Sequence, residues 1–188
     1  VIMSDNSILI KNALILSPNT NFKNKQSILI KDNLIAEISS QIDESNASKI
    51  IDATGKIVIP GLINTHTHLS MTLFRGLADD LSLDSWLNDH IWPMEANLNG
   101  DFCYIGALLG AVELIKSGTT TFSDMYFYME DVARAIDEAG IRAVLSYGMI
   151  DFGDEEKRKN EIKANLELFE ACDGMADGRI KVFFGPHS

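Results

Sequence analysis

The sequence predicts an α/β protein in which a small β module, residues 1–56, precedes a region of alternating strands and helices, residues 57–188. Short runs rich in β-branched residues, separated by turn residues, indicate the β module. From Ile57 onward, apolar runs alternate with helical segments, which is the pattern of βαβ units around a parallel sheet. The run 180–185 is almost continuously apolar, as expected for a strand buried on both faces.

In the module, strands are predicted at residues 8–16, 27–30, 34–39 and 49–52. Turn-forming residues at 17–19 and 31–33 separate the first three of these strands. Short strands joined by such turns favour a small antiparallel sheet.

In the second region, strands are predicted at residues 57–66, 119–124, 142–147 and 180–185, and helices at 101–117, 129–139 and 155–172. A long excursion, 69–97, rich in Leu, Trp and Met, separates the first strand from the first helix. Asn99 or Asp101 can cap the first helix, and Gly118 and Gly140 can end the first two helices.

The end of the strand 57–66 carries two histidines, His66 and His68, with one residue between them. Alternate residues of a strand point to the same face, so the two imidazoles are expected to project together. This is a metal-ligand spacing, because two neutral imidazoles can bind one divalent ion when further ligands converge on it. The alternative, two solvated polar residues at a strand end, is weaker, since an apolar run closed by Pro60-Gly61 normally continues into a buried strand.

The run from Val58 to Leu98, with its PGLINTHTH and IWPME motifs, resembles the start of the metal-dependent hydrolase barrel of the amidohydrolase superfamily. More narrowly, it is similar to the 5-methylthioadenosine/S-adenosylhomocysteine deaminases. The stretches 117–126 (SGTTTFSDMY) and 185–188 (GPHS) extend the resemblance over nearly the whole chain.

The resemblance implies that residues 57–188 are the first half, about four strands, of a (β/α)₈ TIM barrel. It also implies that residues 1–56 are half of a composite β-sandwich, with incompletely paired edges. The 188 residues are fewer than the roughly 250 of a typical complete barrel, so we expect a piece of a longer protein.

By resemblance, His66 and His68 are two ligands of one Zn²⁺, or alternatively Fe²⁺. The remaining ligands and the catalytic acid and base are expected beyond residue 188, so the 188 residues alone are expected to be inactive. Glu95 in IWPME matches the glutamate that holds the ribose hydroxyls, although an isolated glutamate is usually a solvated surface acid. His187 matches the histidine that contacts the purine ring.

One position departs from the family pattern. Members that bind the homocysteine carboxylate commonly have an arginine at the end of strand three, where this sequence has Tyr147. A phenol donates one hydrogen bond but cannot form the bidentate, charged pair of a guanidinium. Arg158 could compensate, although its charged neighbourhood favours a solvated helix face.

Other polar or aromatic residues have less specific signals. Asp124, at the end of strand two, could line the site or cap the following turn. Trp86 and Trp92 could stack on a purine, but aromatic residues in apolar stretches usually belong to the core. His90 is expected at the surface or rim.

Composition restricts the partners. The formal net charge is −11 without a basic cluster, which makes a nucleic acid an unlikely partner. Cys103 and Cys172 lack a CxxC spacing, and we expect buried free thiols in a reducing compartment. No signal sequence and no apolar run of about 18 residues is visible, so we expect a cytoplasmic protein that does not use a membrane.

The expected function is hydrolytic deamination of an adenine-type nucleoside: 5-methylthioadenosine, S-adenosylhomocysteine or adenosine. The alternatives are another amidohydrolase, such as a guanine, cytosine or s-triazine deaminase or chlorohydrolase, and a catalytically incomplete piece. We expect the chain to form a homo-oligomer or to associate with a missing C-terminal half, because half a barrel leaves strand edges unpaired.

Overall fold

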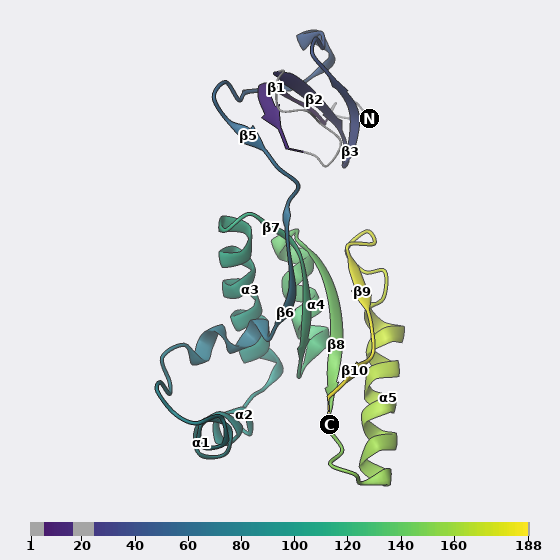
Figure 1. Ribbon diagram of the computed structural model, residues 1–188. Helices are drawn as coiled ribbons and strands as arrows, with labels where there is room; N and C mark the ends of the chain where they lie inside the picture. The colour runs from purple at the N-terminus through teal and green to yellow at the C-terminus, as the bar shows by residue number, and fades with distance from the viewer. Residues whose placement is uncertain (1–5, 17–24, 188) are drawn as a thin grey trace. The chain divides into compact units, whose positions relative to one another are not determined.

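The computed structural model describes residues 6–16 and 25–187 and is a mixed α/β fold (Figure 1). The chain separates into two compact units, unit 1 from Val1 to Pro60 and unit 2 from Gly61 to Ser188. The turn predicted at 17–19 lies outside the described residues.

Unit 1 is one five-stranded sheet in the order β3-β2-β1-β4, with β5 also paired to β1. Its elements are β1 (Ser7–Ile15), β2 (Gln26–Lys31), β3 (Leu34–Ser39), the 3₁₀ helix η1 (Glu44–Asn46), β4 (Lys49–Asp52) and β5 (Ile57–Val58). The predicted antiparallel sheet is correct for β1–β2 and β2–β3 but wrong for β4 and β5, which run parallel to β1. The reason is the connection through η1, which carries the chain from one edge of the sheet to the other.

Strand β1 changes partner along its length at Asn12. Lys11 still pairs with Asp52 of β4, whereas Leu14 pairs with Ile57 of β5. Asn12 adopts a φ of 62°, a left-handed conformation that asparagine tolerates, and its Nδ2 donates to Asp52 Oδ1 at 3.0 Å. Beyond Asn12, Ala13 and Ile15 pack with Ile28 into the small core of the unit.

The strand predicted at 57–66 is wrong as a single element. Ile57–Val58 is β5 of unit 1, and a separate strand, β6 (Leu62–Thr67), begins unit 2. Pro60 cannot donate to a strand ladder, and a Cβ on Gly61 would collide with the side chain of Thr120. The Pro60-Gly61 pair therefore interrupts the strand that the apolar pattern suggests.

Unit 2 is built from βα units around a parallel sheet in the order β10-β8-β7-β6, with β9 also on β8. The strands are β6, β7 (Thr119–Tyr126), β8 (Arg142–Met149), β9 (Ile180–Val182) and β10 (Gly185–Pro186), and the long helices are α3 (Gly100–Lys116), α4 (Met129–Ala139) and α5 (Glu155–Cys172). The parallel α/β fold predicted for this region is therefore observed.

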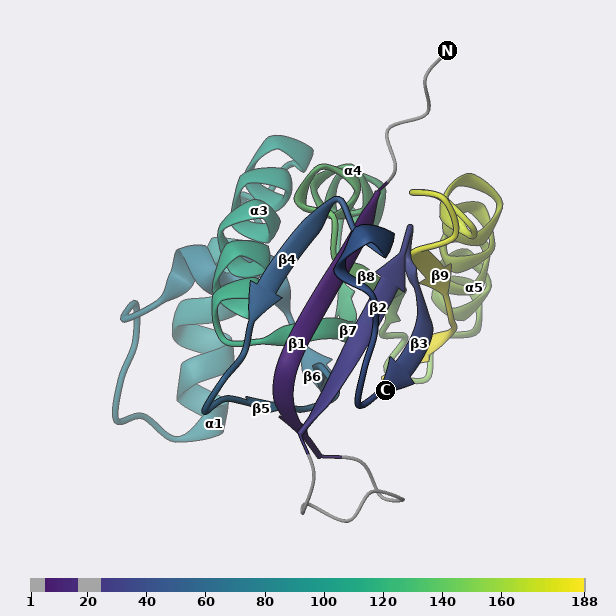
Figure 2. The ribbon, with the colours of Figure 1, turned by 90° about the horizontal axis from the view of Figure 1, so that it is seen from above.

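Helices α3, α4 and α5 lie side by side along one face of the sheet (Figure 2). The core between them is formed by fully buried residues of the strands and helices, including Phe122, Val132, Ile136, Leu145 and Ile180. Both cysteines are buried free thiols, as predicted.

The ends of the long helices follow the predicted signals. Asn99, the first of the two candidates, caps α3, because its Oδ1 accepts from Phe102 N at 3.0 Å. Gly140 ends α4 with a φ of 77°, a backbone conformation that glycine adopts without strain. No single helix of the described ranges could cross a membrane, although Leu83–Glu95 and Gly100–Lys116 together reach the necessary length and composition across a 117° bend.

The excursion 69–97 contains short helical pieces rather than irregular chain alone. These are η2 (Leu69–Phe74, 3₁₀), α1 (Leu83–Ser85), η3 (Trp86–Ile91, π) and α2 (Trp92–Glu95). Helix η2 packs closely on α3, where a Cβ on Gly106 would approach Ser70 O to 2.5 Å. Two glycines of α3, Gly106 and Gly110, thus make room for the chain that follows β6.

The strand predicted at 180–185 is also wrong as one element. Ile180–Val182 pairs with Ala143–Leu145 of β8, and Gly185–Pro186 pairs with Gly148–Met149 further along the same strand. Between them, Phe183 and Phe184 belong to neither strand, and their side chains are 64% and 56% exposed. The apolar run predicted burial, but these two side chains stay exposed, although Phe183 N still donates to Leu145 O of β8 at 2.9 Å.

Candidate functional site

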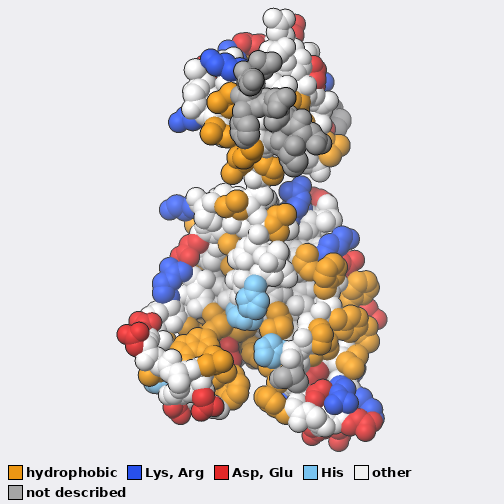
Figure 3. Space-filling view, viewed as in Figure 1, with side chains coloured by type: hydrophobic (Ala, Val, Ile, Leu, Met, Phe, Trp, Pro, Cys, Tyr) orange, Lys and Arg blue, Asp and Glu red, His pale blue; other side chains and the backbone are white. Residues whose placement is uncertain are grey.

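The imidazoles of His66 and His68 lie next to each other where β6 ends. His66 is in the strand, and His68 is the residue that precedes η2. Their ring centroids are 5.2 Å apart at an interplanar angle of 76°. His66 is exposed and His68 is half-buried, so the pair faces outward from the sheet end. Histidine side chains are visible in the middle of unit 2 in Figure 3, beside a hollow.

His68 is oriented by the neighbouring strand. Its Nδ1 lies 2.6 Å from the carbonyl oxygen of Met125, and since a carbonyl can only accept, Nδ1 carries the proton. This tautomer leaves Nε2 with its lone pair, the form in which histidine binds a metal.

The chain after His68 is held on two sides. Asp124 Oδ1 accepts from Leu69 N at 2.9 Å, and Ser70 Oγ donates to Cys103 O at 2.9 Å. Asp124 is 1% exposed, and its Oδ2 has no hydrogen-bond partner among the described residues. Burial raises the pKa of this carboxyl to about 7. The Asp124 carboxylate thus binds the chain that follows β6, at the first residue of η2.

Tyr126 is hydrogen-bonded to Glu95 and lies close to His68. Tyr126 Oη donates to Glu95 Oε1 at 2.7 Å, and the Tyr126 ring centroid is 6.1 Å from that of His68. Partial burial raises the pKa of Glu95, whereas the Tyr126 hydrogen bond and the nearby His68 lower it. The pKa of Tyr126 is raised by burial and by the carboxylate, so its hydroxyl remains a donor at neutral pH.

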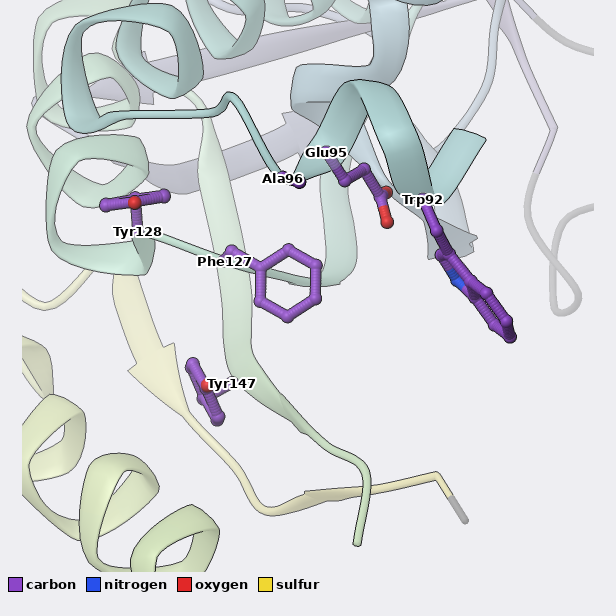
Figure 4. A pocket seen from close by; sticks show the side chains of 6 residues that line it. All are labelled: Trp92, Glu95, Ala96, Phe127, Tyr128 and Tyr147. Atoms are coloured by element: carbon purple, nitrogen blue, oxygen red, sulfur yellow. The ribbon is translucent and has the colours of Figure 1, made fainter. Parts of the chain in front are cut away.

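A cleft of about 530 Å³ opens beside Glu95. Figure 4 shows its lining, in which the Phe127 ring lies between Glu95 and Tyr147 and Trp92 stands on the other side of Glu95. The residues that line it are Trp92, Glu95, Ala96, Phe127, Tyr128 and Tyr147. One carboxylate among aromatic rings suits a ligand with hydroxyl groups and a flat apolar part. Trp86 and His90 do not belong to this lining and are half-buried in η3.

His187 lines a second cleft of about 360 Å³, to which Glu95 does not contribute. This cleft is lined by Met149, Asp151, Arg158, Glu161, Ile162, Pro186 and His187. Arg158 is exposed on α5, as expected for a solvated helix face, and its Nε donates to Asp151 Oδ2 at 2.8 Å. Asp151 thus offsets the positive charge that this arginine would offer to an anionic group.

The donor set fits part of a metal site. Imidazole nitrogen suits zinc or iron, and the fixed tautomer of His68 is the one that a metal requires. No group of three or more His, Cys, Asp or Glu side chains suited to a metal ion occurs in residues 6–16 and 25–187. His66 and His68 alone supply two of the four ligands of a usual zinc site.

Sequence reasoning missed Tyr126 and Phe127. The second strand was predicted to end at residue 124, whereas β7 continues to Tyr126. The missed signal is the alternation along the strand, since Phe122, Asp124 and Tyr126 are all buried on one face. Continuing that alternation by one step would have placed a tyrosine at the sheet end.

A family model described as the amidohydrolase family matches residues 57–188. The chain is 77% identical over 187 residues to a protein of Methanobrevibacter smithii named 5'-deoxyadenosine deaminase, covering 99% of the chain and 43% of that protein. It is 49% identical over 182 residues to a Thermococcus sibiricus protein named 5-methylthioadenosine/S-adenosylhomocysteine deaminase, covering 97% of the chain and 43% of that protein. The chain thus spans less than half the length of these curated relatives.

Solved structures give the same fold. An adenosine deaminase of Xanthomonas campestris with bound zinc superposes with a TM-score of 0.81 at 28% identity, covering 96% of this chain and 42% of that one. An atrazine chlorohydrolase of Arthrobacter aurescens in complex with zinc has a TM-score of 0.79 at 21% identity, covering 95% and 46%. The second likeness shows the fold alone.

Proposed function

This chain belongs to the amidohydrolase family, and we propose that the protein containing it hydrolyses the amino group of an adenine nucleoside. Water replaces the exocyclic amine of the ring, giving the inosine analogue and ammonia. The observation that carries the proposal is the connection of His66 and His68 to Glu95 through Tyr126 at one end of the sheet. It joins two candidate metal ligands to a carboxylate that can bind ribose.

The substrate class follows from what the relatives' names share. 5'-Deoxyadenosine, 5-methylthioadenosine, S-adenosylhomocysteine and adenosine have the same adenine and the same ribose diol, and they differ at the 5' position. Glu95 would accept hydrogen bonds from the diol, and the rings of Trp92, Phe127 and Tyr147 would pack on the apolar parts of the nucleoside. Neither Tyr147 nor the Asp151-paired Arg158 favours a substrate carboxylate, which makes a neutral 5' group the better ligand.

Zn²⁺, or alternatively Fe²⁺, would be held by His66 and by Nε2 of His68. When bound, such an ion lowers the pKa of a water ligand toward neutrality and so supplies a nucleophile. The protein's own part in this is to fix the tautomer of His68 through the Met125 carbonyl.

We further propose that unit 2 is the first part of a (β/α)₈ barrel and that unit 1 is half of a composite β-sandwich. The alternation of β6 to β10 with α3 to α5 supports the first statement. The exposed apolar side chains of β3, Leu34 and Ile35, support the second, since a further sheet would cover them. The 188 residues alone would then be inactive, because two imidazoles complete half of a four-coordinate site.

The test is ammonia release by the complete protein supplied with zinc. Adenosine, 5'-deoxyadenosine and 5-methylthioadenosine should be turned over, whereas guanine and an s-triazine should not. The variants His66→Ala and His68→Ala should lose both bound zinc and activity, and His90→Ala, a histidine outside the cleft lining, should keep both. Turnover of guanine or the triazine instead would select another amidohydrolase activity, and no turnover of any substrate would contradict the proposal.

A further inference from the structure

Tyr126 occupies a position that links the two halves of the candidate site. It is the last residue of β7 and is 4% exposed, although its hydroxyl reaches a polar group. Its ring lies 6.1 Å from the His68 ring and 5.2 Å from the Phe127 ring, measured between centroids. A buried tyrosine usually finds a partner for its hydroxyl, and here that partner is Glu95.

Glu95 needs such an anchor. It is the last residue of α2, a helix of four residues. Trp92 and Met94 of the same helix are each 42% exposed. A short helix with an exposed face does little to fix the rotamer of a glutamate. The Tyr126 hydrogen bond crosses 31 residues of sequence and attaches the carboxylate to the rigid end of the sheet.

The Tyr126 hydrogen bond also determines which acceptor positions of the Glu95 carboxylate remain for a ligand. An ionised carboxylate offers about four acceptor positions on its two oxygens. Tyr126 takes a position on Oε1, which leaves the other acceptor positions of Glu95, a residue that lines the cleft together with Trp92 and Phe127. An anchored carboxylate can then accept from two vicinal hydroxyls without losing side-chain freedom on binding.

We propose that Tyr126 is a positioning residue that holds Glu95 in the orientation that recognises the ribose diol. The inference rests on the proposed function and goes beyond it, since it assigns sugar selectivity to a residue that does not itself line the cleft. Tyr126 acts through Glu95 and contacts no reacting atom.

The experiment compares Tyr126→Phe with the unaltered complete protein on adenosine and 2'-deoxyadenosine. The phenylalanine keeps the buried ring and removes the hydroxyl. Loss of a hydrogen bond to a charged group corresponds to about a 10- to 100-fold effect. We expect KM for adenosine to rise by about that factor with a smaller change in kcat, and the preference for the ribo over the deoxy substrate to shrink.

Tyr104→Phe is the matched control, because Tyr104 Oη also donates to a glutamate, Glu138, away from the cleft. Its kinetics should equal those of the unaltered protein. Glu95→Ala and the double variant with Tyr126→Phe complete a cycle. If Tyr126 acts through Glu95, adding Tyr126→Phe to Glu95→Ala causes no further rise in KM.

Additive losses, or an unchanged ribo-to-deoxy ratio in Tyr126→Phe, would overturn the inference and leave Tyr126 a packing residue. Calorimetric binding of the same two nucleosides separates this result from failure of the proposed function. A protein that binds adenosine without releasing ammonia contradicts deamination, while its ribo-to-deoxy binding ratio still decides the role of Tyr126. Binding of neither nucleoside overturns both.

Discussion

Met125 contributes to the candidate metal site with its main chain rather than its side chain. Its carbonyl accepts from His68 Nδ1, and any residue at position 125 has such a carbonyl. The type of side chain at this position therefore does not predict the role. Only the register of β6 beside β7, with Thr67 opposite Asp124, brings this carbonyl to His68. The sequence predicts the two histidines from their spacing, but the group that orients one of them depends on strand register.

Asp124 leads to a prediction about pH. Its folded-state pKa, about 7, is above the ordinary 3.8, so between these values the folded protein binds more protons than the unfolded one. The free energy of unfolding therefore falls as pH rises from about 4 to 7, by at most about 1.4 kcal/mol per pH unit. Asp124→Asn keeps an oxygen for Leu69 N and removes the ionisation. Relative to the unaltered protein, it should gain up to about 2 to 3 kcal/mol between pH 5 and pH 8.

Urea unfolding of the complete protein at several pH values measures this difference. The exposed Asp101, changed to Asn, controls for loss of a carboxylate as such. Parallel pH profiles for Asp124→Asn and the unaltered protein would mean that the buried carboxyl does not titrate in this range.

At the scale of elements, the sequence predicts the long helices well and the strand ends poorly. Helix α3 begins one residue before the predicted start and is capped by Asn99, because capping depends on a few adjacent residues. The divided strands at Pro60-Gly61 and Phe183-Phe184 were missed, since apolar content does not reveal where a ladder stops. A Cβ on Gly61 would lie 2.2 Å from the side chain of Thr120, which is 59 residues further along the chain.

The close contact of η2 with α3 gives a second prediction. Gly106→Ala would place a Cβ 2.5 Å from Ser70 O, a backbone atom that cannot rotate away. We expect the complete protein to lose about 1–3 kcal/mol of unfolding free energy, as for other overpacked sites. Because Ser70 is two residues from His68, zinc affinity should fall as well. The measurements are denaturant unfolding and zinc competition with a chelator.

Gly148→Ala is the control for this variant. Its new Cβ would lie 3.6 Å from Met125 Cγ, an ordinary van der Waals distance, and stability should change little. If Gly106→Ala is as stable as Gly148→Ala and binds zinc normally, η2 has room to move and does not hold His68 in place.

At the scale of the whole molecule, unit 2 carries apolar surface that folding of this chain does not bury. A stripe on α3, defined by Phe102, Ile105, Leu109, Val112 and Ile115, is 44–55% exposed. Ile162, Leu166 and Phe169 of α5 are 40–49% exposed, and apolar surface is visible over α5 in Figure 3. Patches of this kind mark surfaces that associate.

We therefore expect the 188-residue chain on its own to self-associate or to bind a separately produced remainder of the protein. Light scattering over a range of concentrations measures the first, and co-purification measures the second. The double variant Ile105→Glu/Leu109→Glu should reduce association if the α3 stripe mediates it, and Asp101→Asn, on the same helix, should not. A monodisperse monomer at all concentrations, with no binding to the remainder, would contradict the expectation.

The same chain should hold zinc weakly, because the described residues offer a pair of imidazoles where four ligands are usual. Metal analysis after dialysis against a chelator should find far less than one zinc per chain. Stoichiometric, chelator-resistant zinc would show that the missing ligands come from elsewhere, for example from a second copy of the chain.

Two kinds of constrained glycine occur in unit 2, and the distinction has a consequence for how the gene can vary. A Cβ at Gly61, Gly106 or Gly110 would lie 2.5 Å or less from a neighbouring atom, whereas Gly118 and Gly140 face open space and have a positive φ. Every missense change of a glycine codon adds a Cβ. In a library of random variants selected for activity, the first three positions should therefore stay glycine, while the last two should also accept asparagine, the residue that best tolerates a left-handed backbone.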